Sequence, residues 1–117
     1  MNKRKVGEQW EIHATEYLKN KGYDIIEHNY RCRMGEIDII AKEQEQLVFV
    51  EVKYRSGRTL GYSLEAITPA KQNTLCKVAA YYLTTVYKSQ NIACRFDVIG
   101  FDTINGKVEI SHIVNAF

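Results

Sequence analysis

Two acidic residues and a lysine follow one another with the spacing D-x(12)-E-x-K, formed by Asp38, Glu51 and Lys53. They lie in the segments GEIDIIAK (35–42) and QLVFVEVKY (46–54), which are rich in β-branched and aromatic residues. Such runs are typical of strands. We therefore expect two neighbouring strands to position all three side chains.

The register of these two strands decides whether the acids meet. A hairpin that turns between Gln44 and Glu45 places residues whose numbers sum to 89 opposite each other, so that Asp38 faces Glu51. Because side chains alternate along a strand, Lys53 projects from the same face. The opposite, uncharged face is expected to carry Ile37, Ile39, Val48, Val50 and Val52. A bulged residue in the hairpin would break this register.

Opposed carboxylates in the middle of two strands repel each other, and acidic residues are disfavoured there. A Mg²⁺ or Mn²⁺ ion removes the conflict, because hard divalent cations prefer oxygen ligands and keep several waters. Beside such a centre, Lys53 could orient a water and stabilise the charge that develops on a phosphate. The spacing alone equally allows ordinary cross-strand ion pairs on a solvated surface, so both interpretations stay open at this point.

The charges are divided unevenly along the chain. Its 117 residues carry 16 basic and 14 acidic side chains, a formal net charge of +2. Residues 35–51 hold five acids against one base, Lys42, so the remainder carries 15 bases and nine acids, a net charge of +6. A basic body around an acidic segment fits an anionic partner together with a cation site. The charge pattern by itself proves neither.

Length and composition favour one domain spanning residues 1–117. Hydrophobic residues make up 45% and charged residues 26%, which argues against a disordered or fibrous chain. The longest apolar runs, LVFV and VAAYYL, are too short to cross a bilayer. Three cysteines without C-x-x-C spacing favour reduced thiols over a zinc or disulfide framework. We therefore expect a cytoplasmic protein without a membrane partner.

The remaining segments predict two helices and three more strands. Apolar residues have helical spacing over 6–21, and Gly22 offers a stop. Thr68 followed by Pro69 predicts the start of a second helix. In that helix we expect a buried stripe at Leu75, Val78, Ala79, Tyr82, Leu83 and Val86. The other strands are expected at 24–30, 93–101 and 107–114, with a loop over 55–67 and a hairpin turn at Asn105-Gly106.

This order of elements, αβββαββ, predicts an α/β fold. The first three strands are close enough in sequence to form an antiparallel meander. The long helix after them suits a right-handed crossover to a parallel neighbour. We expect a mixed five-stranded sheet flanked by helices.

The segments GEIDII and VFVEVKYR together resemble the split active-site motif of the PD-(D/E)XK nuclease superfamily, which has the restriction-endonuclease-like fold. The chain as a whole is similar to the bacterial YraN-like family of uncharacterised proteins, which in turn resembles archaeal Holliday junction resolvases. The similarity also includes EIHATEYLKNKGY, HNYRCRMGEIDIIA, AITPAKQNTL, RFDVIGF and HIVNAF. It implies that Asp38, Glu51 and the backbone carbonyl of Val52 bind the metal ion, and that Lys53 is the catalytic lysine.

The resemblance also implies a catalytic glutamate from the first helix. Alignment on the pattern A-x-x-Y-L selects Glu11 rather than Glu8, and helical geometry places Glu11 at the edge of the apolar stripe. The alternative is an exposed carboxylate near the positive end of the helix. The sequence departs from the family pattern in two places: Ile37 replaces a proline before Asp38, and Trp10 stands where a glycine is usual.

Basic residues near the two site strands could contact phosphates, which dominate affinity for nucleic acids. The candidates on the strands and their flanks are Arg31, Arg33, Arg55 and Arg58. Lys71 and Gln72 lie in the first turn of the second long helix, where amide and ammonium donors could bind a phosphate. An ordinary solvated position is an equal alternative for each of them.

Asp97 is a polar residue in an otherwise apolar strand, and we expect it to form a structural ion pair with a nearby arginine. His13, His28 and His112 lack the spacing of metal ligands and are interpreted as surface or packing residues.

Two functions follow as hypotheses. The first is a Mg²⁺- or Mn²⁺-dependent endonuclease that acts on DNA, including branched or junction DNA. The alternative is a non-catalytic nucleic-acid-binding module with the same fold. A homodimer is compatible with either hypothesis.

Overall fold

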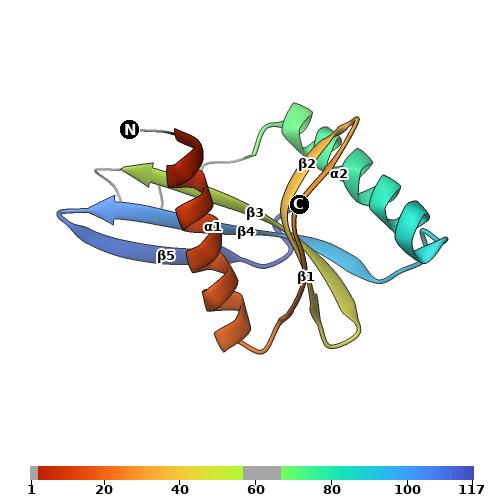
Figure 1. Cartoon of the computed structure of the whole chain (residues 1–117), viewed down its shortest axis with the longest axis horizontal. Coiled ribbons are helices and arrows are strands. Elements are labelled where there is room, and N and C mark those ends of the chain that lie inside the picture. The colour runs from red at the N-terminus through yellow and green to blue at the C-terminus, as the bar shows by residue number, and fades with distance from the viewer. Residues whose placement is uncertain (1–2, 57–66) are drawn as a thin grey trace.

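The computed structural model describes residues 3–56 and 67–117, and within them two α-helices, one π-helix and five strands (Figure 1). The chain order is α1 (Lys3–Asn20), β1 (Asp24–Cys32), β2 (Gly35–Glu43), β3 (Gln46–Ser56), α2 (Pro69–Tyr82), η2 (Leu83–Tyr87), β4 (Cys94–Ile104) and β5 (Lys107–Ile113). This confirms the expected αβββαββ order. Most of the loop expected over 55–67 lies outside the described residues, and β3 continues to Ser56.

The five strands form one mixed sheet in the order β1-β2-β3-β4-β5. The pairs β1–β2, β2–β3 and β4–β5 are antiparallel, whereas β3 and β4 are parallel. The expected meander and the crossover through α2 to a parallel strand are therefore both confirmed.

The β2–β3 hairpin has the register expected from the sequence. Its pairs run from Glu43↔Gln46 at the turn to Ile39↔Val50, and every pair of numbers sums to 89. No bulge interrupts this stretch. The strands therefore keep the register that the two-residue turn sets. The paired ladder ends at Ile39↔Val50, one residue before Asp38.

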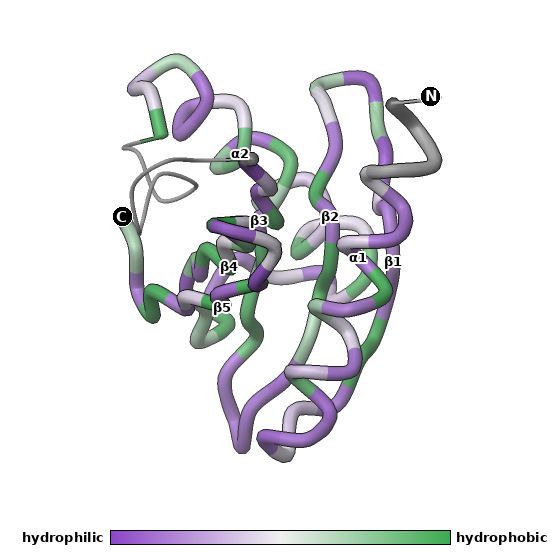
Figure 2. The backbone as a smooth tube through the Cα atoms, turned by 90° about the vertical axis from the view of Figure 1, so that its left-hand side faces the viewer, coloured by the Kyte–Doolittle hydropathy of each residue, from purple (hydrophilic) through white to green (hydrophobic). Residues whose placement is uncertain are grey.

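The two long helices cover opposite faces of the sheet (Figures 1 and 2). Buried residues of α1, Ala14 and Leu18, pack in one cluster with Ile39, Val48 and Val50. The other face packs against α2, where Leu75, Val78, Ala79 and Tyr82 meet Ile40, Leu47 and Phe49. Figure 2 shows hydrophobic residues along the central strands, and many hydrophilic residues along the helices and turns.

One residue lies on the other face from the one expected. Ile37 is buried in the α2 cluster, although its neighbour two positions on, Ile39, lies in the α1 cluster. Strict alternation would put both on the same face. The alternation fails because the strand changes its pairing at Asp38, where the β2–β3 ladder ends.

The second helix starts as expected but ends differently. The Thr68 hydroxyl accepts a hydrogen bond from the Lys71 amide at 3.1 Å, and Pro69 follows at the first helical position. The expected burial of Val86 is wrong, since this side chain is 52% exposed. The chain is a π-helix from Leu83 to Tyr87, whose wider turn rotates Val86 away from the α-helical stripe.

The turn at Asn105-Gly106 is confirmed, with φ values of +51° and +77° that suit a tight hairpin. All three cysteines have free thiols. Among the described helices, none combines the length and the hydrophobicity required to cross a membrane.

Candidate functional site

The Asp38 side chain forms a hydrogen bond with the backbone of β3 just beyond the end of the β2–β3 ladder. Its Oδ2 accepts a hydrogen bond from the Val52 amide at 2.8 Å. Continuing the register would pair Ile37 with Val52 through their main chains, so the Asp38 carboxylate replaces that step of the ladder. A residue in a strand directs its N–H and C=O to the same edge, so the Val52 carbonyl also faces β2.

The Asp38 and Glu51 carboxyl groups are in contact, as the predicted register requires. The pKa of Asp38 is raised to about 9, mainly by burial and further by the negative charge of Glu51 and a side-chain hydrogen bond with Glu51. The hydrogen bond from the Val52 amide acts in the opposite direction. The Asp38 carboxyl group therefore keeps its proton well above its ordinary pKa, which relieves its repulsion with Glu51.

Glu51 forms an ion pair with Lys71. The Lys71 Nζ atom lies 3.4 Å from Glu51 Oε2, with the Glu51 side chain 11% and the Lys71 side chain 46% exposed. This contact places the start of α2 against the carboxylates. Lys71 therefore points to the end of the sheet that the sequence analysis assigned to it.

Glu11 reaches the same region from α1. Burial raises the pKa of Glu11, and the negative charges of Glu36, Glu8 and Glu51 raise it further. Glu11 Oε1 is the one buried side-chain oxygen without a hydrogen-bond partner among the described residues. A cavity of about 330 Å³ adjoins this carboxyl group, and its lining is formed by Glu8, Glu11, Ile12, Thr15, His28 and Asn29. This unpartnered buried oxygen, which lies within electrostatic range of Asp38 and Glu51, could act as a ligand for a cation.

Lys53 is half-buried and lies two residues beyond Glu51, where its backbone pairs with Gly100 of β4. Its ammonium forms no hydrogen bond or ion pair within the part of the chain that the structure describes. The adjacent Tyr54 ring stacks on Trp10, with ring centroids 4.5 Å apart. Trp10 precedes Glu11, so this stack joins the backbones that carry two predicted site residues.

The other basic candidates are only partly gathered at the site. Arg31 forms an ion pair with Glu36, its cross-strand partner in the β1–β2 hairpin, and Arg33 is exposed in the turn of that hairpin. Arg55 is exposed and donates to the Tyr54 carbonyl at 2.9 Å. The side-chain amide of Gln72 donates a hydrogen bond to the Ile67 carbonyl at 2.9 Å. Arg58 lies outside the described residues.

The donor set fits a hard divalent cation. Carboxylate and carbonyl oxygens are available from Asp38, Glu51, Glu11 and Val52, and the proton on Asp38 can be exchanged for a metal ion. In residues 3–56 and 67–117, no three acidic, histidine or cysteine side chains already stand close enough to enclose an ion. Binding would therefore require Glu11 or water to close the coordination shell.

A larger cavity, of about 390 Å³, lies between α1 and the β4–β5 hairpin, away from the acid pair. Its lining is mainly aromatic and aliphatic and includes Trp10, Tyr17, Phe101, Val108 and Ile110. Only Glu16 supplies a carboxylate there. This cavity lacks the paired acids that metal-assisted chemistry needs.

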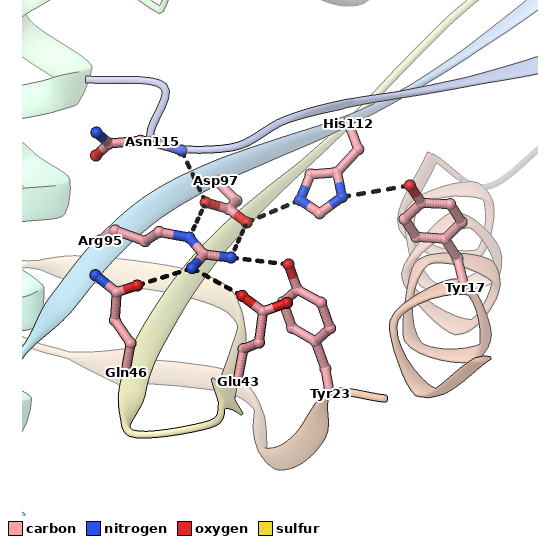
Figure 3. Close-up of polar contacts among 8 residues, drawn as sticks. All are labelled: Tyr17, Tyr23, Glu43, Gln46, Arg95, Asp97, His112 and Asn115. Carbon is pink, nitrogen blue, oxygen red and sulfur yellow. Dashed lines mark hydrogen bonds and ion pairs between the residues drawn. The ribbon is translucent and has the colours of Figure 1, made fainter. Parts of the chain in front are cut away.

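Asp97 is fully buried in a separate polar network (Figure 3). Arg95 Nε donates to its Oδ1 at 2.9 Å, which confirms the expected structural ion pair. His112 Nε2 lies 2.8 Å from Asp97 Oδ2, and the Asn115 amide donates to Oδ1 at 3.0 Å. Burial alone would raise the pKa of Asp97, but these hydrogen bonds together hold it below its usual value.

Two residues that shape these sites were not predicted from the sequence. His112, interpreted as a surface or packing residue, connects Asp97 to the Tyr17 hydroxyl of α1, 3.3 Å from its Nδ1 (Figure 3). Glu36 had no assignment, although its charge acts on Glu11 and it pairs with Arg31. The ion pair of Glu36 with Arg31 could have been predicted from the two-residue turn Arg33-Met34, because this turn places Arg31 opposite Glu36 in the β1–β2 hairpin.

A family model described as "Uncharacterised protein family UPF0102" matches residues 10–101. The chain belongs to this family. It is 46% identical to the UPF0102 protein of Caldicellulosiruptor saccharolyticus over the full length of both chains. It is 47% identical to the UPF0102 protein of Lachnoclostridium phytofermentans, over all of this chain and 96% of the relative. It is 43% identical to the UPF0102 protein of Nitrosococcus oceani, over 97% of this chain and 92% of the relative.

The UPF0102 match includes the acid pair, Glu11, Lys53 and Lys71, together with the Trp10–Tyr54 stack. It ends at Phe101, before β5 and the residues from that strand and the C-terminal segment that enclose Asp97. The family model therefore covers the whole candidate site and only part of the Asp97 network.

Proposed function

We propose that this UPF0102 protein is a Mg²⁺- or Mn²⁺-dependent endonuclease of the PD-(D/E)XK superfamily that hydrolyses phosphodiester bonds in DNA, branched or junction DNA included. The assignment to the superfamily rests on the resemblance of GEIDII and VFVEVKYR to its split motif. The observation that carries the proposal is the contact between the Asp38 and Glu51 carboxyl groups, whose electrostatic strain a divalent cation relieves.

Each site residue then has a role in the hydrolysis. Asp38 and Glu51 would hold the ion through carboxylate oxygens, and the Val52 carbonyl faces β2, the strand that carries Asp38. Bound there, the ion would supply charge stabilisation for the phosphate and make a water more acidic. Glu11 offers its unpartnered oxygen to a ligating water or to the ion. Lys53 orients the attacking water and stabilises the negative charge of the phosphate.

Binding of the nucleic acid would rely on cations around the acidic centre. Arg33 and Arg55 are exposed, and Arg31 and Lys71 are each paired with one acid. Phosphate contacts by such residues position a duplex without reading its sequence. We therefore expect binding that weakens steeply with salt and depends little on base sequence.

One observation favours the alternative, a non-catalytic nucleic-acid-binding module. Lys71 already neutralises Glu51 in the protein alone, so the acid pair can persist without a metal ion. A binding module would nevertheless have no use for the opposed carboxyl groups of Asp38 and Glu51, because their contact destabilises the folded protein.

The deciding experiment compares cleavage with binding. The wild type, Asp38→Ala and Lys53→Ala are incubated with single-stranded, duplex, flap and four-way-junction DNA and with RNA, in Mn²⁺ and in EDTA. A matched control is Lys42→Ala, because Lys42 is exposed on the same hairpin. The endonuclease proposal expects Mn²⁺-dependent cutting by the wild type and Lys42→Ala only. Binding of these substrates without any cutting would support the binding module.

The cytoplasmic location and the homodimer stay predictions. Light scattering of the purified chain measures its mass in solution and tests the second.

A further inference from the structure

Lys71 occupies a position in α2 where a cation is locally unfavourable. It is the third residue of the helix, after the cap Thr68, and the positive end of the helix dipole normally favours acidic side chains there. The first turn of α2 contains no acid. A residue that breaks this local rule needs a compensating partner, and Glu51 is that partner.

The two members of this ion pair differ in exposure. Glu51 is 11% exposed and lies against Asp38, so its charge is costly without a counter-ion. Lys71 is 46% exposed, so its ammonium can leave Glu51 for solvent without passing through packed side chains. The ion pair therefore forms in the protein alone, and the exposed Lys71 ammonium can be replaced at Glu51 by another cation.

Other polar groups at the start of α2 are already engaged. The Lys71 amide donates to the Thr68 hydroxyl at 3.1 Å, the Gln72 amide N–H donates to the Thr68 carbonyl at 2.9 Å, and the Gln72 side chain donates to Ile67. The Lys71 ammonium takes part in none of these hydrogen bonds, so it can change partner without breaking the cap.

We propose that Lys71 is an exchangeable counter-ion of Glu51: its ammonium leaves the carboxylate when a divalent cation takes that position, and then binds a phosphate of the nucleic acid. This inference rests on the proposed metal-dependent function and adds a coupling between the two ligands. Until a metal ion binds, the Lys71 ammonium stays paired with Glu51 and does not contact the nucleic acid.

The electrostatic reason is simple. An ammonium 3.4 Å from Glu51 and a divalent ion on the same carboxylate repel each other, so the Lys71 contact opposes metal binding. A phosphate attracts the displaced ammonium and removes that repulsion. Metal and nucleic acid must then each raise the affinity for the other by the same factor, as linkage requires.

The test uses Lys71→Met, which keeps the length of the side chain and removes its charge. Lys77→Met is the matched control, because Lys77 is an exposed lysine of the same helix without an ion pair among the described residues. Lys71→Arg keeps the charge and should restore the wild-type behaviour. Thermal melting identifies any variant that does not fold.

Two measurements are made on each protein. Calorimetric titration with Mn²⁺, without DNA, is expected to give roughly three- to tenfold tighter binding for Lys71→Met, because the competing charge is gone. The affinity for a four-way junction is then measured against salt concentration, with Ca²⁺ and with EDTA. In Ca²⁺ the slope of log affinity against log salt should fall by about one for Lys71→Met, and in EDTA it should not change.

The outcomes separate this inference from the proposed function. A wild type that binds no Mn²⁺ overturns both. A wild type that binds Mn²⁺ and cuts DNA, while Lys71→Met behaves as Lys77→Met, overturns only the exchange. An equal loss of slope in Ca²⁺ and in EDTA also overturns it, since Lys71 would then be an ordinary phosphate contact.

Discussion

The Asp38 carboxylate accepts a hydrogen bond from the Val52 amide at 2.8 Å, in the place where the next main-chain bond of the β2–β3 ladder would be. One short acidic side chain therefore ends the strand pairing and satisfies the freed amide. The Asp38 side chain also lies in contact with the Glu51 carboxyl group, on the adjacent strand. Structure and chemistry depend on the same residue at this point.

Replacement of Asp38 by asparagine should stabilise the protein in EDTA. The pKa of Asp38 is raised from 3.8 to about 9, so the folded state holds a proton that the unfolded state has lost between these values. The stability of the wild type therefore falls as pH rises from about 4 to about 9, and asparagine avoids this loss. We expect a gain of at least about 1.4 kcal/mol at pH 7, the value of one pKa unit.

Urea denaturation of the wild type and Asp38→Asn at pH 5, 7 and 9 measures this difference. Glu45→Gln is the control, because Glu45 is exposed in the hairpin turn and should change stability by less than about 0.5 kcal/mol. A stability difference between Asp38→Asn and the wild type that does not grow with pH would show that Asp38 is ionised in the folded protein.

Loss of Asp97 should be strongly destabilising at neutral pH. Asp97→Ala leaves Arg95 and His112 without their buried partner, and the expected cost is about 3–5 kcal/mol. The pKa of Asp97 is lowered in the folded state, so its contribution is present above pH 3.8 and disappears as pH falls through the folded value. Denaturation at pH 7 and pH 2.5 tests this, with the exposed Asp24→Ala as control. An equal cost at both pH values would contradict the ionic role.

Gly35 begins β2 under a tight constraint from α2. A Cβ atom there would lie 2.9 Å from Thr74 Cγ2 and 3.3 Å from Val78 Cγ2, at a φ of +153°. We expect Gly35→Ala to lower the free energy of unfolding by about 1–3 kcal/mol. The addition of Thr74→Ser removes the closest methyl group and should recover part of the loss. No recovery would indicate that the backbone angle, rather than the contact, limits this position.

Trp10 should support catalysis without touching the ion. Its ring stacks on Tyr54, with ring centroids 4.5 Å apart, and lies 4.8 Å from the Phe101 ring, which holds α1 against the strand that carries Lys53. We expect Trp10→Ala to lower kcat at least about tenfold with little change in KM for DNA, because Glu11 is less well positioned. Trp10→Phe, which keeps a stacking ring, should retain most of the activity. Equal kcat values for Trp10→Ala and the wild type would contradict this role.

The sequence was sufficient for features that depend on local rules. The two-residue turn and the alternating pattern predicted the sum-of-89 register, and with it the contact between Asp38 and Glu51. It also predicted that Lys71 points to the acid pair. These features follow from strand and helix geometry within one or two elements.

Other features depended on departures from regular geometry. Ile37 lies on the α2 face because a side chain, Asp38, replaces a main-chain bond of the ladder. Val86 is exposed because the helix widens to a π-helix at Leu83, and His112 meets Asp97 through the pairing of β4 with β5. Neither periodicity nor residue type signals such changes, since they arise when elements pack together.

The central claim is that Asp38 and Glu51 form the metal centre of an endonuclease, and single-turnover cleavage of a four-way junction in Mn²⁺ tests it most directly. The measurement compares the wild type with Asp38→Asn, which we expect to be folded and at least as stable. We expect cleavage by the wild type in Mn²⁺, none in EDTA, and a loss of at least about 100-fold in Asp38→Asn. Cleavage by Asp38→Asn at the wild-type rate would contradict it.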